Sequence, residues 1–279
     1  MQGIGDLVQE AFDEKWAVGQ FNISSLEVAQ GIAAASERAS GPVIIGTSNG
    51  TIRHLGFDYV RMIVEEVRRH ARGQVFVHMD HGTEELAHRC IDAGWDSVMI
   101  DASEQPYDEN VRITRGVVEH ARRRGVAVEA QIGRTWEPDN ERYGEDCDTH
   151  PDEAERFVAD TGIDWLAVSI GNNPGAVEYR AAPIQLDVLE EIENSCGVPI
   201  VMHGGTNVGD DTMRGAIQLG VAKVNIDTAV RRAVTEAVTG YYRDNPGSLD
   251  IRPCMAGARE HVTETVMAKM ELFGSSGRS

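Results

Sequence analysis

The sequence has few cysteines, and none of them form a CxxC pair. The four that are present are widely spaced, at Cys90, Cys147, Cys196 and Cys254. Such spacing argues against a disulfide framework and against a zinc site built from cysteines alone. We therefore expect neither kind of scaffold.

The sequence also lacks long apolar stretches. No apolar run approaches the roughly 20 residues that a membrane-spanning helix needs. Residues 1–16 are amphipathic and acidic, whereas a secretion signal is basic and strongly apolar. These two absences predict a cytoplasmic protein without a membrane partner.

Positive charge is scarce as well. Lys and Arg number 26 against 45 Asp and Glu, which gives a formal net charge of -19. The long-range field of such a chain repels nucleic acid and anionic membrane surfaces. We therefore expect no nucleic-acid partner, and an anionic substrate would need positive groups placed locally in its site.

Eight short apolar runs alternate with amphipathic helical stretches along the 279 residues. Strands that are apolar throughout, each followed by a helix, are typical of a parallel sheet covered on both faces. Eight such units, without a GxGxxG turn after the first, favour an α/β fold of the closed (β/α)8 TIM barrel type over an open doubly wound sheet. We predict one barrel domain over residues 1–274 and a flexible tail over 275–279. The predicted strands are 16–22, 42–48, 74–80, 97–101, 127–133, 165–171, 199–205 and 221–227.

Polar residues stand where these strands end, and in such barrels the carboxyl ends of the strands carry the active site. Asp80 and His81 follow the third strand, and His203 ends the seventh. Two histidines at one barrel mouth favour a shared metal ion. The other polar residues at these ends are Asn22, Ser48, Asn49, Asp101, Glu129, Gln131, Asn172, Asn173, Asn225 and Asp227.

The segments HGGT (203–206) and NIDT (225–228) follow strands seven and eight. Barrels commonly bind phosphate at this position through backbone N–H groups and helix N-termini. A glycine pair alone is a weak signal, but its position after the seventh strand makes it a phosphate-site candidate.

The motifs AVGQFN, HMDHG, VMIDAS, VEAQIG, HGGT and KVNIDT resemble, in order and spacing, the class II zinc-dependent fructose-bisphosphate and tagatose-bisphosphate aldolases. The resemblance implies a TIM barrel, a homodimer or homotetramer, and cleavage of a ketose bisphosphate to dihydroxyacetone phosphate and an aldehyde. It implies that Asp80 is the catalytic acid/base and that His81 and His203 bind zinc or another divalent metal. The substrate or phosphate contacts that we predict from the resemblance and from the strand ends together are Asn22, Ser48, Gly175, Arg180, Gly204, Gly205, Thr206, Asn225, Ile226, Asp227 and Thr228.

The sequence departs from the family pattern at the third zinc histidine, where Pro174 stands instead. Proline has no side-chain ligand, so a metal bound with high affinity would need another third ligand. Glu129 is our first candidate. Further candidates are Asp101, Asn172, Asn173, Cys147 and His150.

The chemistry of a retro-aldol cleavage fits these residue types. A Lewis-acid metal stabilises the enediolate, and a carboxylate takes the hydroxyl proton at the breaking bond. Adjacent residues on a strand point in different directions, so Asp80 and His81 can serve proton transfer and metal binding separately. The alternative Schiff-base route requires a lysine at a strand end. Lys223 is the only strand lysine and stands before the polar NID tip, so we do not expect this route.

Two other functions remain open at this point. One is a metal-independent isomerase or carbon–carbon bond enzyme that uses Asp80 and Glu129 for proton transfer. The other is a non-catalytic sugar-phosphate-binding protein.

Overall fold

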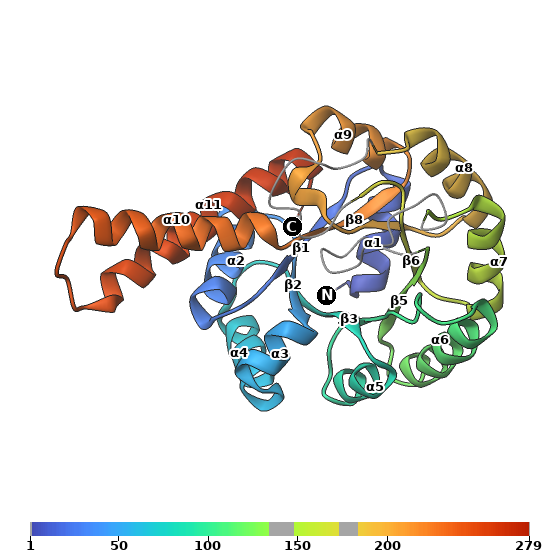
Figure 1. Cartoon of the computed structure of the whole chain (residues 1–279), viewed down its shortest axis with the longest axis horizontal. Coiled ribbons are helices and arrows are strands. Elements are labelled where there is room, and N and C mark those ends of the chain that lie inside the picture. The colour runs from blue at the N-terminus through green and yellow to red at the C-terminus, as the bar shows by residue number, and fades with distance from the viewer. Residues whose placement is uncertain (1, 134–147, 173–183, 279) are drawn as a thin grey trace.

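Eight parallel strands close into a barrel in the computed structural model, which describes residues 2–133, 148–172 and 184–278. Each strand pairs with its neighbours in chain order, and β8 pairs with β1 (Figure 1). The predicted TIM barrel and all eight predicted strands are confirmed. The strands are β1 Val18–Asn22, β2 Val43–Ser48, β3 Val75–Gly82, β4 Ser97–Ile100, β5 Ala127–Ile132, β6 Trp165–Val168, β7 Ile200–Met202 and β8 Val221–Ile226.

Helices surround the barrel, and several begin at a side chain that caps them. Ser25, Ser48 and Thr83 each accept a hydrogen bond from a backbone N–H three residues later, which stabilises the first turns of α2, α3 and α5. The helices are α1 Ile4–Asp13, α2 Leu26–Ala39, α3 Asn49–Leu55, α4 Phe57–His70, α5 Glu84–Asp92, α6 Tyr107–Arg122, α7 Pro151–Thr161, α8 Leu186–Cys196, α9 Asp210–Gln218, α10 Thr228–Asp244 and α11 Ile251–Phe273, with a short 3-10 helix, η2, at Gly205–Asn207.

The two final helices, α10 and α11, run side by side and project beyond the barrel as an arm (Figure 1). The barrel end of α11 is anchored by apolar side chains such as Val262, Val266 and Phe273, which are buried in the main core. Among the described residues, no helix combines the length and apolar character needed to cross a membrane.

Strand β5 shows how the barrel sorts its side chains. Val128, Ala130 and Ile132 point outward into the core between strands and helices. The alternate residues Glu129 and Gln131 are equally buried but belong to the barrel interior, because side chains alternate across a strand. Polar groups therefore enter the interior of a sheet whose outer face is apolar.

The amino end of the barrel is closed by α1. Its residues Ile4, Leu7, Val8 and Ala11 are buried against interior strand residues that include Trp165. This plug makes the lower half of the barrel interior apolar. The open mouth therefore lies at the other end, where the strands finish.

Two register shifts break the regular alternation. Between β3 and β4, Met79 pairs with Val98 and Gly82 with Ile100, so β3 contains one extra residue there. Between β7 and β8, Ile200 pairs with Val221 and the next residue of β7 pairs with Lys223, so β8 contains one extra residue. Bulges of this kind re-aim the side chains beside them.

The segment after α11 lies against the barrel, although the sequence predicts a flexible tail there. Ser275 is fully buried, and the backbone N–H of Gly277 donates to Ala39 O over 2.9 Å. The Arg278 guanidinium forms an ion pair with Glu14. These contacts place residues 275–278 on the barrel surface, because the turn after α11 directs the chain back toward α2.

Candidate active site

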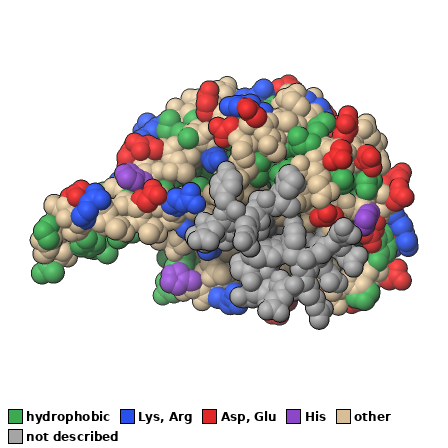
Figure 2. Space-filling model, turned by 45° about the horizontal axis from the view of Figure 1, so that its top comes forward, with side chains coloured by type: hydrophobic (Ala, Val, Ile, Leu, Met, Phe, Trp, Pro, Cys, Tyr) green, Lys and Arg blue, Asp and Glu red, His purple; other side chains and the backbone are tan. Residues whose placement is uncertain are grey.

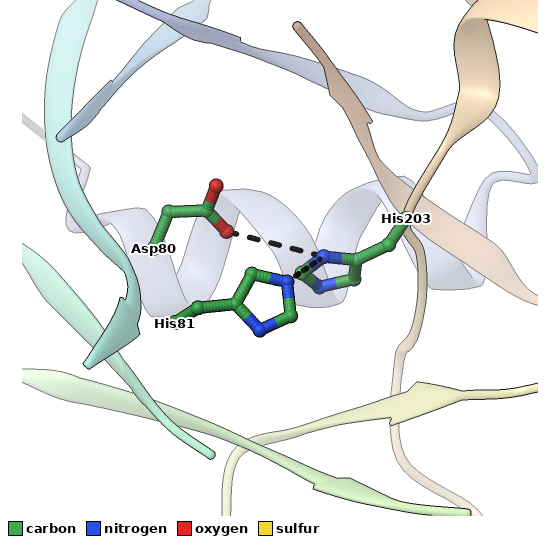
Figure 3. Close-up of side chains that lie close together, drawn as sticks. All are labelled: Asp80, His81 and His203. Carbon is green, nitrogen blue, oxygen red and sulfur yellow. Dashed lines mark hydrogen bonds and ion pairs between the residues drawn. The ribbon is translucent and has the colours of Figure 1, made fainter. Parts of the chain in front are cut away.

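Two imidazole rings face each other at the barrel mouth. His81 Nε2 lies 2.9 Å from His203 Nδ1, and the ring centroids are 4.6 Å apart (Figure 3). Asp80 Oδ1 lies 3.9 Å from the same His203 nitrogen. These three residues form the only cluster of potential metal ligands found within the described part of the chain. The sequence-predicted pair of metal-binding histidines is therefore brought together.

The bulge in β3 explains how adjacent residues reach one point. Neighbours on a regular strand point to opposite faces, so the sequence predicts that Asp80 and His81 diverge. Instead, His81 has a left-handed backbone conformation with φ of 50° inside the bulge. This conformation is unusual for a residue other than glycine and is often found at functional sites. It turns His81 toward the side of the barrel that Asp80 already faces (Figure 3).

A carboxylate contacts the outer nitrogen of each imidazole. Asp101 Oδ2 lies 2.7 Å from His81 Nδ1, and Glu129 Oε1 lies 2.7 Å from His203 Nε2. Carboxylates accept hydrogen bonds, so these contacts favour a proton on the outer nitrogen of each ring. The two nitrogens that face each other then carry lone pairs. Lone pairs at this distance need a proton or a metal cation between them.

The charges around the two rings also favour a cation. Burial acts to lower the pKa of His81, but the hydrogen bond to Asp101 and the nearby carboxylates outweigh it and raise the pKa to about 9. Against the effect of burial, the same contact lowers the pKa of Asp101 to about 2. A metal ion and a proton would compete for the same lone pair of His81. The residues present therefore fit a divalent metal ion.

Asp80 is held in place by two amides. Asn22 Nδ2 donates to Asp80 Oδ2 over 2.8 Å, and Asn225 Nδ2 donates to Oδ1 over 3.0 Å. Burial would raise the pKa of Asp80, but positive charge on nearby groups, led by His81 and His203, outweighs burial and lowers it. Asp80 is therefore an ionised, oriented proton acceptor.

Gly46 on β2 makes room for this arrangement. A Cβ at Gly46 would lie 2.0 Å from Asn22 Oδ1 and 2.5 Å from Gln20 Nε2. Any larger residue would displace Asn22 from Asp80. The Gln20 amide in turn donates to Asn22 Oδ1 over 3.0 Å, so the support for Asp80 continues into the barrel.

Below the mouth, Glu129 and Lys223 form a fully buried ion pair with Lys223 Nζ 2.8 Å from Glu129 Oε2. The Lys223 amine does not line the site cavity. This burial supports the expectation that the chain does not use a Schiff-base lysine there.

Three candidates for the third metal ligand form hydrogen bonds with other groups of the site. Glu129 and Asp101 lie on the outer nitrogens of the two rings, and Asn172 donates to His203 O while accepting from Ile170 N. Among the described carboxylates, Asp80 is the one that forms a cluster with both histidines in which one ligand atom of each residue lies within 4.8 Å of the others.

The other candidate positions for a third ligand lie elsewhere in the chain. His150 lines a separate pocket beside α6 and α7. Asn173, Pro174 and Cys147 lie outside the described residues.

A cavity of about 270 Å³ opens above the histidines. Most of the residues predicted as substrate or phosphate contacts line this cavity, whereas Gly175 and Arg180 lie outside the described part of the chain. The predicted residues that line the cavity are Asn22, Ser48, Asp80, His81, His203, Gly204, Thr206, Asn225, Asp227 and Thr228.

Two predicted contacts do not reach this lining with a side chain. Ile226 is buried in the core between the barrel and its helices, because it alternates with the inward-facing Asn225. Gly205 is buried beneath the mouth, and a Cβ there would lie 2.4 Å from Val224 Cγ1. Gly205 thus allows η2 to pack closely over β8.

Sequence reasoning missed three lining residues, Gly50, Asn207 and Arg231. Arg231 matters most, because it brings positive charge to the mouth of an acidic protein. Its guanidinium lies 2.6 Å from Asp227 Oδ2, one helical turn earlier. The sequence signal that could have identified Arg231 is its position four residues after Asp227, because residues at i and i+4 are neighbours on the surface of a helix.

A closed parallel barrel with paired histidines and a carboxylate at its mouth defines a class of metal-dependent barrel enzymes, and comparisons with known proteins narrow the class. The family model for class II fructose-bisphosphate aldolase matches residues 3–278. A fructose-bisphosphate aldolase of Geobacillus stearothermophilus is 39% identical over 98% of this chain and 97% of its own length. One from Giardia intestinalis is 34% identical over 98% and 93%.

Comparison with solved structures supports the same family assignment. The crystal structure of the YdjI aldolase from Escherichia coli K12 has a TM-score of 0.87 and 31% identity, covering 100% of this chain and 99% of that one. This chain belongs to the class II fructose-bisphosphate aldolase family. It is a metal-dependent, aldolase-like carbon–carbon lyase, and the family implies a sugar-phosphate substrate.

Proposed function

We propose that the protein catalyses the reversible aldol cleavage of a phosphorylated ketose, with dihydroxyacetone phosphate as the three-carbon product and donor. One observation carries this proposal: two carboxylate-oriented histidines face each other beside an oriented, ionised Asp80 at a barrel mouth. Family membership supports the reaction type.

We further propose zinc as the metal, held by His81 Nε2 and His203 Nδ1, because two imidazole ligands suit zinc. When bound, the metal acts as a Lewis acid that stabilises negative charge developing on the ketose oxygens. Asp80 lies beside this pair, but its two oxygens are held by Asn22 and Asn225, and we assign it proton transfer rather than metal binding. Glu129 and Asp101 orient the rings, as such carboxylates do in many zinc sites.

Asp80 is the proposed acid/base. Its two oxygens are fixed by Asn22 and Asn225, and its lowered pKa keeps it ionised. In the cleavage direction it accepts the proton of the hydroxyl at the breaking bond. In the condensation direction it returns that proton to the new alkoxide oxygen.

The phosphate is proposed to bind between η2 and the start of α10. Gly204, Thr206 and Thr228 line this side of the cavity, and the first turn of α10 contains no acidic residue. A helix N-terminus favours an anion through its free N–H groups and its dipole. Arg231 supplies the local positive charge that a chain of net charge -19 needs.

The proposal is tested by metal analysis and by product detection. Protein purified without chelator should contain one divalent metal per chain, and His81→Ala and His203→Ala should each lose it. With zinc restored, wild type should release a triose phosphate from one of a panel of ketose phosphates, as measured with a coupled dehydrogenase. Wild-type metal content in both variants, or no cleavage across the panel by metal-loaded wild type, would count against the proposal.

The arm supports a further proposal, that the protein is a homodimer. Tyr242, Leu249 and Ile251 are 40%, 96% and 57% exposed at the far end of α10 and α11. Figure 2 shows hydrophobic side chains gathered at this end of the molecule. Exposed apolar clusters often mark protein interfaces, and a second copy is the partner we propose. Light scattering should give a dimer mass for wild type and a monomer mass for Leu249→Asp/Ile251→Asp.

We also propose a cytoplasmic location. Cys90, Cys196 and Cys254 are free thiols, and free thiols are usual in reducing compartments. Fractionation of cells that contain the protein would test this proposal.

A further inference from the structure

Lys223 lies beneath the site with a side chain that is fully buried in the barrel interior. Its Nζ lies 2.8 Å from Glu129 Oε2 and 2.6 Å from Asn225 Oδ1. Each of these partners contacts residues with a proposed role in catalysis. Glu129 contacts the proposed metal ligand His203, and Asn225 contacts the proposed acid/base Asp80 and, over 3.2 Å, His203 Nδ1.

The first of these two routes fixes the proton on His203. A lysine ammonium can only donate hydrogen bonds, so Glu129 must accept from it, and an ionised carboxylate can only accept. His203 Nε2, 2.7 Å from the other Glu129 oxygen, must therefore be the protonated nitrogen. This leaves the lone pair on Nδ1, the atom that faces His81 Nε2.

The second route fixes the orientation of the Asn225 amide. The Asn225 carbonyl oxygen has to face Lys223, because Lys223 offers only donors. The amide nitrogen then points to the mouth, where it donates to Asp80 Oδ1 over 3.0 Å. If the amide were flipped, its oxygen would face the carboxylate and repel it. One ammonium group thus sets the hydrogen-bond direction in both routes.

We propose that Lys223 is a positioning residue that fixes the His203 tautomer through Glu129 and the Asp80 orientation through Asn225. This inference rests on the proposed roles of His203 and Asp80. Stability alone does not account for the ion pair, because a buried ion pair can often be replaced by apolar residues without loss of stability. The site uses the directional donors of Lys223, which an apolar pair would lack.

The sharpest test is a rescue experiment with Glu129→Gln. In that variant, Lys223 should attract the oxygen of the introduced amide, so the amide nitrogen turns toward His203 Nε2. The His203 proton is then forced onto Nδ1, the proposed ligand atom. We expect zinc affinity, measured by chelator competition, to fall by about 10- to 100-fold, the range for lost orienting partners.

Removing the lysine as well should restore part of this affinity. In Glu129→Gln/Lys223→Met no ammonium holds the oxygen of the introduced amide, so this amide can rotate and accept from His203 Nε2. The double variant should bind zinc about tenfold or more tightly than Glu129→Gln alone. A purely structural role for Lys223 predicts no rescue. Equal or weaker zinc binding by a folded double variant would overturn the proposal.

Histidine ¹⁵N NMR of the metal-free proteins gives a readout that does not depend on catalysis. His203 should carry its proton on Nε2 in wild type and on Nδ1 in Glu129→Gln. Unchanged tautomers would also overturn the proposal. If the tautomers change as expected but wild type cleaves no ketose phosphate, the positioning role stands and the proposed function fails.

A single substitution of Lys223 tests both routes at once. Lys223→Met should lower zinc affinity and kcat, with the loss in kcat exceeding any change in KM, because Asp80 loses its orientation. Ser97→Ala is the matched control, since Ser97 is an equally buried interior residue that contacts His78 and neither working group. Wild-type zinc affinity in folded Lys223→Met would contradict the proposal. If Lys223→Met does not fold, the double variant Glu129→Gln/Lys223→Met, in which neither member of the ion pair is left charged, tests the proposal instead.

Discussion

The two ends of the barrel interior differ in what fills them. At the amino end, α1 and strand residues such as Met99 and Trp165 form an apolar plug. At the carboxyl end, the interior contains Asp80, Glu129 and Lys223, all buried and all charged or hydrogen-bonded. Both halves are built from the same eight strands. The comparison indicates that the plug stabilises the fold, while the polar half is arranged for chemistry at a cost in stability.

The cost arises because charged groups lose hydration when they are buried. The polar half offsets it with hydrogen bonds that form a connected network from Gln20 to His203. Groups in such a network depend on one another, so a change to one member should disturb the others and with them the function of the site. The plug is held together by apolar packing, so a change there should alter the free energy of unfolding and leave the site unaffected.

Asp80→Ala should have the largest effect, and the effect should be on rate. Loss of the proposed acid/base is expected to lower kcat by about 10²- to 10⁴-fold, the usual range for a general acid/base, which is about 2.7 to 5.4 kcal/mol in the barrier. The free energy of unfolding should change much less. Steady-state kinetics and denaturant unfolding on the same preparation provide both measurements. A wild-type kcat in this variant would remove Asp80 from the mechanism.

Leu7→Ala tests the opposite end. Leu7 on α1 is 2% exposed within the plug, and burying less apolar surface there should cost about 2 to 5 kcal/mol in the free energy of unfolding. The folded fraction should keep its kcat and its zinc affinity, because the contacts of Leu7 are apolar packing contacts within the plug. Tyr59→Ala on the exposed face of α4 is a control, with Tyr59 65% exposed. A kcat that falls along with stability in folded Leu7→Ala would show that the two ends are coupled.

The sequence predicts the strands well because they follow apolar periodicity. It predicts the histidine pair because His81 and His203 each end a strand of one barrel. It does not predict that Asp80 and His81 converge, because the extra residue in β3 leaves no mark in the alternation of residue types. Simple strand periodicity leads to the opposite expectation.

The supporting contacts were harder to foresee for a related reason. Glu129 and Lys223 lie far apart in sequence, and only the barrel closure and the bulge in β8 bring them together. From sequence, Glu129 was a candidate metal ligand, whereas the structure places it on the outer nitrogen of His203. A carboxylate at this position could bind the metal directly or accept a hydrogen bond from the outer nitrogen of a histidine ligand. The two arrangements differ by only a few ångströms, and residue spacing in the sequence does not distinguish them.

Near neutral pH, His78 gives the smallest predicted effect, and it lies at the boundary between the two halves. Burial, and after it the positive charge of Lys223, lower the pKa of His78 to about 3. Its Nδ1 lies 2.9 Å from Ser97 Oγ, and Glu129 Oε2 lies 3.6 Å from its Nε2. The native protein therefore keeps His78 neutral, while the unfolded chain protonates it below its ordinary pKa of about 6.5.

Stability should consequently fall as pH decreases from about 6.5 toward 3, because the unfolded state then binds the extra proton. One such group contributes at most about 1.36 kcal/mol per pH unit. His78→Gln removes this group, so the difference in unfolding free energy between wild type and variant should change with pH across this window. Above pH 7 the difference should be constant. Denaturant unfolding of both proteins at a series of pH values measures it, and parallel curves from pH 7 down to pH 4 would show that His78 is protonated equally in the folded and unfolded states.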